Sequence, residues 1–144
     1  MDIKEFSKIF GNCILDGDKI FINKEQLHDA LVFAISNYSY DMLKEIIAVD
    51  LEDSIELIYH LYSTENSEDL KLSIVVQNEA QTVTDIFKSA IADENEIYDL
   101  FGVSFTDNKN LKRLYLPESW EGHPLRKDYV QNDTRLAWND DNNA

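Results

Sequence analysis

Two segments in the middle of the sequence, residues 55–62 and 70–76, repeat large apolar residues at every second position. The apolar sets are Ile55, Leu57, Tyr59 and Leu61 in the first segment and Leu70, Leu72, Ile74 and Val76 in the second. This period is typical of β-strands with one buried face. The polar link over 63–69 is short enough to join them as an antiparallel pair. The buried face of such a pair needs a cover, which indicates helices packed on one side of a sheet.

The residues before this pair predict another strand and two helices. Residues 43–49 contain the branched apolar residues that favour strands. Apolar residues recur at three- and four-residue intervals over 3–10 and over about 24–38, which predicts amphipathic helices, the second with Asn23 as its N-cap. Between them, the Asp-Gly pair at 16–17 separates two apolar runs, a pattern typical of a tight hairpin turn.

Helical spacing returns after the strands. The apolar residues from Val83 to Phe101 recur at helical intervals, with Thr82 as the predicted N-cap and Gly102 as the predicted end. Beyond Phe105 regular structure fades, and prolines and polar loop residues take over.

This order of elements predicts an α+β fold. We expect a two-layer sandwich in which helices cover a mainly antiparallel sheet, followed by an extended C-terminal arm. The expected division is an α+β domain over residues 1–105 and an arm over residues 106–144 that docks on a partner subunit.

The charge of the chain excludes some partners. Formal net charge is −15, and residues 1–110 hold 22 acidic and 8 basic side chains. A body this acidic repels a phosphate backbone, so neither nucleic acid nor an anionic membrane surface is an expected partner. A basic or neutral protein is the expected partner.

The sequence lacks the usual signatures of a cofactor site. The lone Cys13 excludes an internal disulfide and an iron–sulfur cluster or thiolate zinc site built from this chain alone. The four glycines do not have the spacing of a nucleotide loop, and the three histidines lie far apart. No apolar run reaches the roughly 20 residues of a membrane helix. We therefore expect a soluble, cytoplasmic chain that binds no cofactor and no metal.

The segment W-E-G-H-P-L-R-K-D-Y at 120–129 fits neither a helical nor a strand period. Gly122 gives the backbone freedom, and Pro124 fixes φ and restricts the residue before it, so an ordered but irregular backbone is expected. Interface cores are enriched in Trp, Tyr and Arg, and the arm carries all three. The arm is therefore a candidate binding surface, and Trp120 can equally fold back to cover the sheet.

The acids of the predicted last helix, Glu94, Glu96 and Asp99, allow three interpretations. Clustered carboxyl groups can serve acid–base catalysis, with His123 as a fourth group. Acids near a helix start more commonly face water and favour the helix dipole. The interpretation that fits best is that the acids over 93–99 pair with Lys112, Arg113, Arg126 or Lys127 and tie the arm to the body or to a partner.

Two blocks then resemble a known family: A-I-A-D-E-N-E-I-Y-D-L-F-G-V-S-F at 90–105 and N-L-K-R-L-Y-L-P-E-S-W-E-G-H-P-L-R-K-D-Y at 110–129. They resemble the signature of the hydrophilic thirty-kilodalton subunit of respiratory complex I and its relatives in energy-converting membrane-bound [NiFe] hydrogenases. The resemblance implies a non-catalytic scaffold in the peripheral arm of a membrane complex. The same resemblance implies that the chain packs against the large [NiFe]-hydrogenase-like subunit, near the iron–sulfur subunits.

The sequence departs from the family pattern at several positions. Asn95 stands where the family usually has arginine, and Ala92 stands where an aromatic is usual. Asn108 and Lys109 replace the His-Pro of many members. These changes indicate a divergent branch and bring any inherited contact there into question.

The expected function is a structural subunit of an energy-converting hydrogenase that couples ferredoxin-linked electron transfer to ion translocation, on the cytoplasmic side of the membrane. The thirty-kilodalton subunit of complex I, or of an NADH or F420H2 dehydrogenase, is the alternative within the class. A free-standing acid–base enzyme and a small acidic adaptor are alternatives of other classes. The resemblance places the [NiFe] centre and the Fe–S clusters in partner subunits. The expected partner interface comprises Glu94, Glu96, Asp99, Arg113, Tyr115, Trp120, His123, Pro124, Leu125, Arg126, Lys127, Asp128 and Tyr129.

Overall fold

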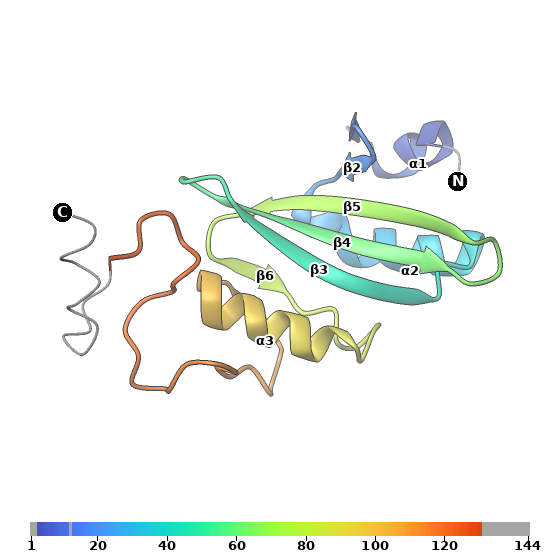
Figure 1. The fold of residues 1–144 in the computed structure, drawn as a ribbon. Coiled ribbons are helices and arrows are strands. Elements are labelled where there is room, and N and C mark those ends of the chain that lie inside the picture. Colours follow the sequence, from blue (N-terminus) through green and yellow to red (C-terminus); the bar gives the residue numbers. More distant parts are fainter. Residues whose placement is uncertain (1–2, 12, 131–144) are drawn as a thin grey trace.

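The structure is a computed structural model that describes residues 3–11 and 13–130. Its centre is a five-stranded sheet with the order β1-β2-β5-β4-β3 (Figure 1). The strands are β1 (Ile14–Asp16), β2 (Lys19–Phe21), β3 (Met42–Asp50), β4 (Ile55–Ser63) and β5 (Glu68–Val76). The helices are α1 (Ile3–Phe10), α2 (Leu27–Tyr38) and α3 (Ala90–Phe101), and a short 3-10 turn (Lys24–Gln26) precedes α2.

The predicted antiparallel pairing of β4 with β5 is confirmed, and β3, whose partner was not predicted, pairs with the other edge of β4. β4 pairs antiparallel with both β3 and β5 along their full lengths. β1 and β2 form the predicted hairpin, and its turn is Gly17-Asp18, one residue later than predicted, because Asp16 pairs with Lys19. β2 joins the sheet by pairing parallel with β5, which the sequence did not predict. A parallel pair of three-residue strands, β6 (Glu79–Gln81) and β7 (Ser104–Thr106), was also not predicted. Such short strands carry too few residues to show a period.

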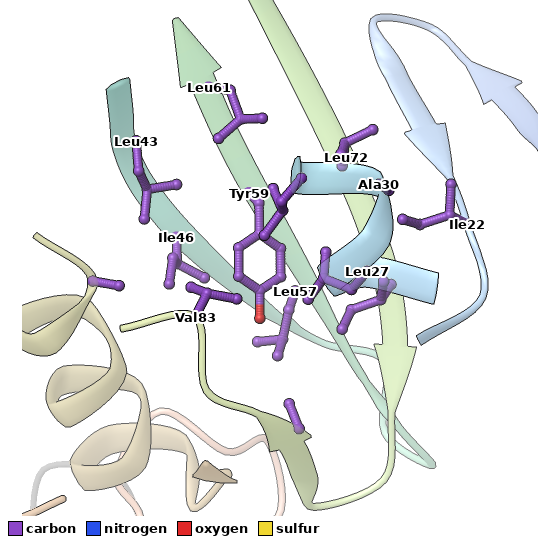
Figure 2. Packing of buried hydrophobic residues seen from close by; sticks show 14 of the residues in the cluster. Ile22, Leu27, Ala30, Leu43, Ile46, Leu57, Tyr59, Leu61, Leu72 and Val83 are labelled. Carbon is purple, nitrogen blue, oxygen red and sulfur yellow. The ribbon is translucent and has the colours of Figure 1, made fainter. Parts of the chain in front are cut away.

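The core lies on one face of the sheet, as the alternating pattern predicted. The apolar sets of β4 and β5 are buried on that face, and Tyr59 lies at its centre with no exposed surface. Figure 2 shows the Tyr59 ring among strand residues such as Ile46 and Leu57, with Leu27 and Ala30 of α2 and Val83 close by. Two layers result, a sheet and the helices that cover it.

The start of α3 differs from the sequence-based expectation. The helix begins at Ala90 with Ser89 as its N-cap, and residues 83–89 form successive turns in place of the helix expected after Thr82. Val83 and Phe87 are nevertheless buried, because a series of turns repeats apolar residues at nearly the same interval as a helix. Periodicity alone therefore could not locate the helix start.

α3 lies along β3, the edge strand of the sheet (Figure 1). The Asp93 carboxylate accepts a hydrogen bond from the backbone N–H of Ile46, and the Ser89 hydroxyl donates to the carbonyl of Leu43 at 3.5 Å. These contacts occupy backbone groups that an edge strand would otherwise leave unpaired. These contacts hold α3 against β3, and the residues that follow the helix pack on it.

Candidate functional site

After β7 the chain runs as an irregular segment, residues 107–130, which we call the arm. It contains no helix or strand, as predicted, but Thr106, the first residue of the predicted arm, belongs to β7. Figure 1 shows the arm in orange, returning beneath α3 and rising past the C-terminal end of that helix. The predicted arm extended to residue 144, and its last part, 131–144, lies outside the described residues.

The main anchor of the arm is the side chain of Asp99, which is fully buried. Its Oδ2 accepts hydrogen bonds from the backbone N–H groups of Leu114, Tyr115 and Leu116 at 3.1, 2.8 and 3.2 Å. Its Oδ1 lies 3.2 Å from Nη1 of Arg113. Burial would raise the pKa of Asp99, but the three N–H groups and the guanidinium outweigh burial and hold that pKa below its usual range. The predicted pairing with Arg113 is confirmed.

A second buried acid, Glu94, holds the start of the arm, and its hydrogen-bond partners among the described residues are all uncharged. It accepts hydrogen bonds from the backbone N–H of Val83 at 2.8 Å, the Thr82 hydroxyl at 2.8 Å and the Asn108 amide at 2.7 Å. Burial raises the pKa of Glu94, and these three donors offset the effect only in part. The expectation that the acids of this helix face water is wrong for Glu94 and Asp99 and right for Glu96, which is exposed.

Both asparagines at which the sequence departs from the family pattern contact the arm or belong to it. Buried Asn95 accepts a hydrogen bond from the backbone N–H of Lys112 at 3.0 Å through its Oδ1. Asn108 donates to Glu94, as described above. At these two positions, therefore, a side-chain amide makes a contact between α3 and the arm.

The arm also caps the C-terminal end of α3. The carbonyl of Leu100 accepts from the backbone N–H of Leu125 at 2.9 Å, and Nδ1 of His123 lies 3.0 Å from the carbonyl oxygen of Asp99. Carbonyls in the last turn of a helix have no hydrogen-bond donor within the helix, and here the arm supplies the donors. The His123 ring lies directly on Gly102, where a Cβ would approach the ring to 2.5 Å.

A further anchor lies at the turn between β3 and β4. Oδ2 of Asp50 accepts from the backbone N–H of Lys127 at 2.7 Å and lies 3.3 Å from Nε of Arg126. These contacts, led by the Lys127 N–H, hold the pKa of Asp50 below its usual range. The proposed pairing of Arg126 with the acids of α3 is therefore corrected, because Arg126 pairs with Asp50, a residue that the sequence did not single out.

The thirteen predicted interface residues divide into two groups. Glu94, Asp99, Arg113, His123 and Arg126 make contacts within the chain, and their role in the arm is internal. Exposed positions are Glu96, Tyr115, Leu125, Lys127 and Asp128, and half-buried ones are Trp120, Pro124 and Tyr129.

Four large apolar side chains of the arm are exposed. Leu114, Tyr115, Leu125 and Val130 are 43%, 67%, 52% and 69% exposed. We call these four residues the outer arm surface. The sequence did not single out Leu114 and Val130, because they belong to no periodic pattern.

The sequence did contain a signal for the burial of Glu94. This residue lies four positions after Ala90 and three before Ile97, both of which are buried on the same face of α3.

The acid–base arrangement considered from the sequence does not assemble. Glu94 and Asp99 are buried in separate hydrogen-bond sets, Glu96 faces outward, and the cavity beside His123 is lined by none of these three carboxylates. Over residues 3–11 and 13–130 no group of three or more His, Cys, Asp or Glu side chains is placed to hold a metal ion. Within the same part of the chain no helix is long and apolar enough to cross a membrane.

Comparison with known proteins gives a family. Residues 20–135 match the family described as respiratory-chain NADH dehydrogenase, 30 kDa subunit. The chain belongs to this family. The matched residues include α3 and the whole arm, so the elements that carry the anchors lie within the family's common region. The resemblance inferred from the sequence blocks is confirmed.

Three relatives share about a third of the aligned residues with this member of the 30 kDa subunit family. It is 33% identical over 117 residues to the C subunit of the NADH-quinone oxidoreductase of Geobacter sulfurreducens, covering 76% of this chain and 72% of that protein. It is 34% identical over 111 residues to the J subunit of the chloroplastic NAD(P)H-quinone oxidoreductase of Agrostis stolonifera, covering 71% and 70%. Against the C/D subunit of the Phocaeicola vulgatus NADH-quinone oxidoreductase, 33% identical, the alignment covers 78% of this chain and 22% of that protein. The chain thus spans only about a fifth of a relative of the C/D type.

The fold also matches a solved structure. A chain in the membrane-bound sulfane sulfur reductase, an archaeal respiratory membrane complex, superposes with a TM-score of 0.76. The match covers 97% of this 30 kDa subunit family member and 88% of the archaeal chain, at 22% sequence identity. At that identity the likeness shows the fold alone, which confirms the predicted α+β class.

Proposed function

We propose that the chain is a non-catalytic structural subunit of a complex I-like membrane oxidoreductase and binds a neighbouring subunit through the outer arm surface. The family membership supports a role in such a complex, since its relatives are named as subunits of quinone oxidoreductases. Its proposed place is the peripheral arm of the complex, on the cytoplasmic side of the membrane.

One observation carries the proposal: the arm is irregular yet firmly anchored, and it displays large apolar side chains. Asp99 and Asp50 accept hydrogen bonds from backbone N–H groups of the arm, and Glu94 accepts one from the side chain of Asn108. A free loop would not need such anchors, and the four side chains of the outer arm surface leave much of their apolar area in solvent. A preorganised apolar surface lowers the entropic cost of binding, because little order must be gained on association.

The specific setting we propose is an energy-converting [NiFe] hydrogenase that couples ferredoxin-linked electron transfer to ion translocation. Its large [NiFe]-hydrogenase-like subunit is the proposed neighbour, and that subunit and the Fe–S subunits would hold the redox cofactors. The second candidate is the thirty-kilodalton subunit of complex I or of an NADH or F420H2 dehydrogenase. The names of the curated relatives favour this second candidate.

Affinity purification of the tagged chain from gently solubilised membranes tests the proposal. The expected companions are Fe–S subunits and a large subunit with four nickel-ligating cysteines, together with hydrogen evolution from reduced ferredoxin. Oxidation of NADH or F420H2 by the same preparation would support the second candidate. Recovery of the chain alone, without companions, would contradict the structural role.

Variants of the outer arm surface locate the contact. Tyr115→Asp and Leu125→Asp should each reduce recovery of the companion subunits about tenfold, because a charge buried in an apolar contact costs binding energy. Val32→Asp is the matched control, since Val32 is 49% exposed and lies on α2. Equal recovery with all three variants would remove the outer arm surface from the interface.

A further inference from the structure

A cavity of about 460 Å³ opens between the arm and the end of α3. One wall is formed by two stretches of the arm, residues 121–123 and Arg126 with residues 128–130. The opposite wall is formed by Phe101 and Gly102 and by the link between β5 and β6 at Gln77 and Asn78. We call this cavity the arm pocket.

Contacts within the chain hold the arm pocket open. Nη2 of Arg113 donates to the carbonyl of Gly122 at 3.1 Å, and Asp50 holds the backbone at Lys127. The Tyr129 ring lies against the backbone of Gly122, where a Cβ would come within 2.9 Å of it. The two arm stretches therefore fix each other as well as the body. The pocket exists before any partner binds.

The side chains of the arm pocket combine aromatic surface with unmatched negative charge. Phe101 and Tyr129 supply apolar faces. The carboxylates of Glu121 and Asp128 are exposed and make no hydrogen bond or ion pair with any residue in 3–11 or 13–130. The two side chains of the lining that can carry positive charge are already engaged, because Arg126 pairs with Asp50 and Nδ1 of His123 lies 3.0 Å from the carbonyl oxygen of Asp99.

We propose that the arm pocket receives a basic side chain, arginine or lysine, from the partner subunit. Its aliphatic stem would lie on Phe101 and Tyr129, and its cationic head would pair with Glu121 and Asp128. Charge complementarity supports this occupant, since the whole chain carries −15 and neither of the two carboxylates has a cation among the described residues. This inference rests on the proposed function, because it names the chemistry by which the same neighbour is recognised.

The test removes the two charges while keeping their shape. The double variant Glu121→Gln/Asp128→Asn is expressed in the full chain, and the tagged complex is washed at rising salt. We expect about tenfold less companion subunit to remain bound and a much weaker dependence on salt. Glu118→Gln is the control, because Glu118 is an exposed arm residue outside the pocket lining and should behave as wild type.

Several outcomes would overturn the inference. Wild-type retention and wild-type salt dependence of the double variant would do so. If Leu125→Asp nevertheless releases the partner, the pocket inference alone fails; if neither releases it, the proposed function fails as well. Loss of binding on Arg135→Ala would assign the pocket to this chain's own C-terminal segment. If the purified chain self-associates and the double variant does not, the occupant of the arm pocket would be a second copy of this chain.

Discussion

Asp99 and Arg113 form an ion pair whose carboxylate has no exposed surface and whose guanidinium-bearing side chain is only 8% exposed. The pair joins the last helix to the arm, and the same carboxylate also orders three consecutive backbone N–H groups. The Asp99 side chain thus holds four consecutive arm residues, 113–116, in place.

Asp99→Ala should strongly destabilise the chain. It would leave the guanidinium and three N–H groups without their acceptor, and breaking a buried pair costs about 3–5 kcal/mol. Urea unfolding measures the loss in free energy of unfolding. Glu96→Gln on the same helix is the control and should change stability by less than about 0.5 kcal/mol, because Glu96 is exposed. Equal stability of both variants would contradict the anchoring role of Asp99.

Gly102→Ala and Gly17→Ala form a matched pair. Both glycines have positive φ, +78° and +61°, so alanine adds about 1–2 kcal/mol of backbone strain at either site. At Gly102 the new Cβ would also displace the His123 ring, whereas at Gly17 it meets nothing within 4 Å. We expect Gly102→Ala to cost about 1 kcal/mol more, the value of a lost hydrogen bond. Equal costs in thermal unfolding would show that His123 does not pack there.

The raised pKa of Glu94 predicts a pH dependence of stability. Between the ordinary glutamate pKa of about 4.3 and the raised value, the folded chain holds more protons than the unfolded chain, so the free energy of unfolding falls as pH rises. Glu94→Gln removes this contribution. The stability of Glu94→Gln relative to wild type should therefore increase as pH rises through that window, as followed by thermal unfolding. A difference that stays flat with pH for Glu94→Gln would contradict the raised pKa.

Asp50→Ala should loosen the end of the arm and leave its start in place. Asp50 accepts from the backbone N–H of Lys127, 77 residues away in sequence, whereas residues 112–116 are held by α3. Hydrogen exchange measured by mass spectrometry should show faster exchange over 123–130 and no change over 112–116. Asp53→Ala, in the same turn, is the control. Unchanged exchange at Lys127 in Asp50→Ala would show that the arm is held by other contacts.

The sequence predicted the helices and long strands because their apolar residues repeat over many positions. It did not predict β6 and β7, whose three-residue parallel pairing depends on segments about 25 residues apart meeting in space. The arm was identified by composition, yet its anchors were only half predicted. Arg113 was paired correctly with an acid of α3, while Asp50 gave no sign of its role, because a long-range contact to a backbone N–H leaves no pattern in sequence.

The burial of the acids of α3 was missed for a different reason. The favoured interpretation, pairing with basic residues of the arm, holds for Asp99 and Arg113, but the helical spacing of Glu94 from the apolar Ala90 and Ile97 was not used to predict burial. The family blocks, by contrast, identified the family correctly from local residues alone, since residues 20–135 match it.

The central claim, that the anchored arm presents the outer arm surface to a neighbouring subunit, is tested most directly by hydroxyl-radical footprinting of the chain alone and within the solubilised complex. Tyr115 and Leu125, 67% and 52% exposed in the isolated chain, should be oxidised readily in the free chain and strongly protected in the complex. Val32 on α2 serves as an internal reference. Oxidation of Tyr115 and Leu125 at the same rate in both samples would contradict the account.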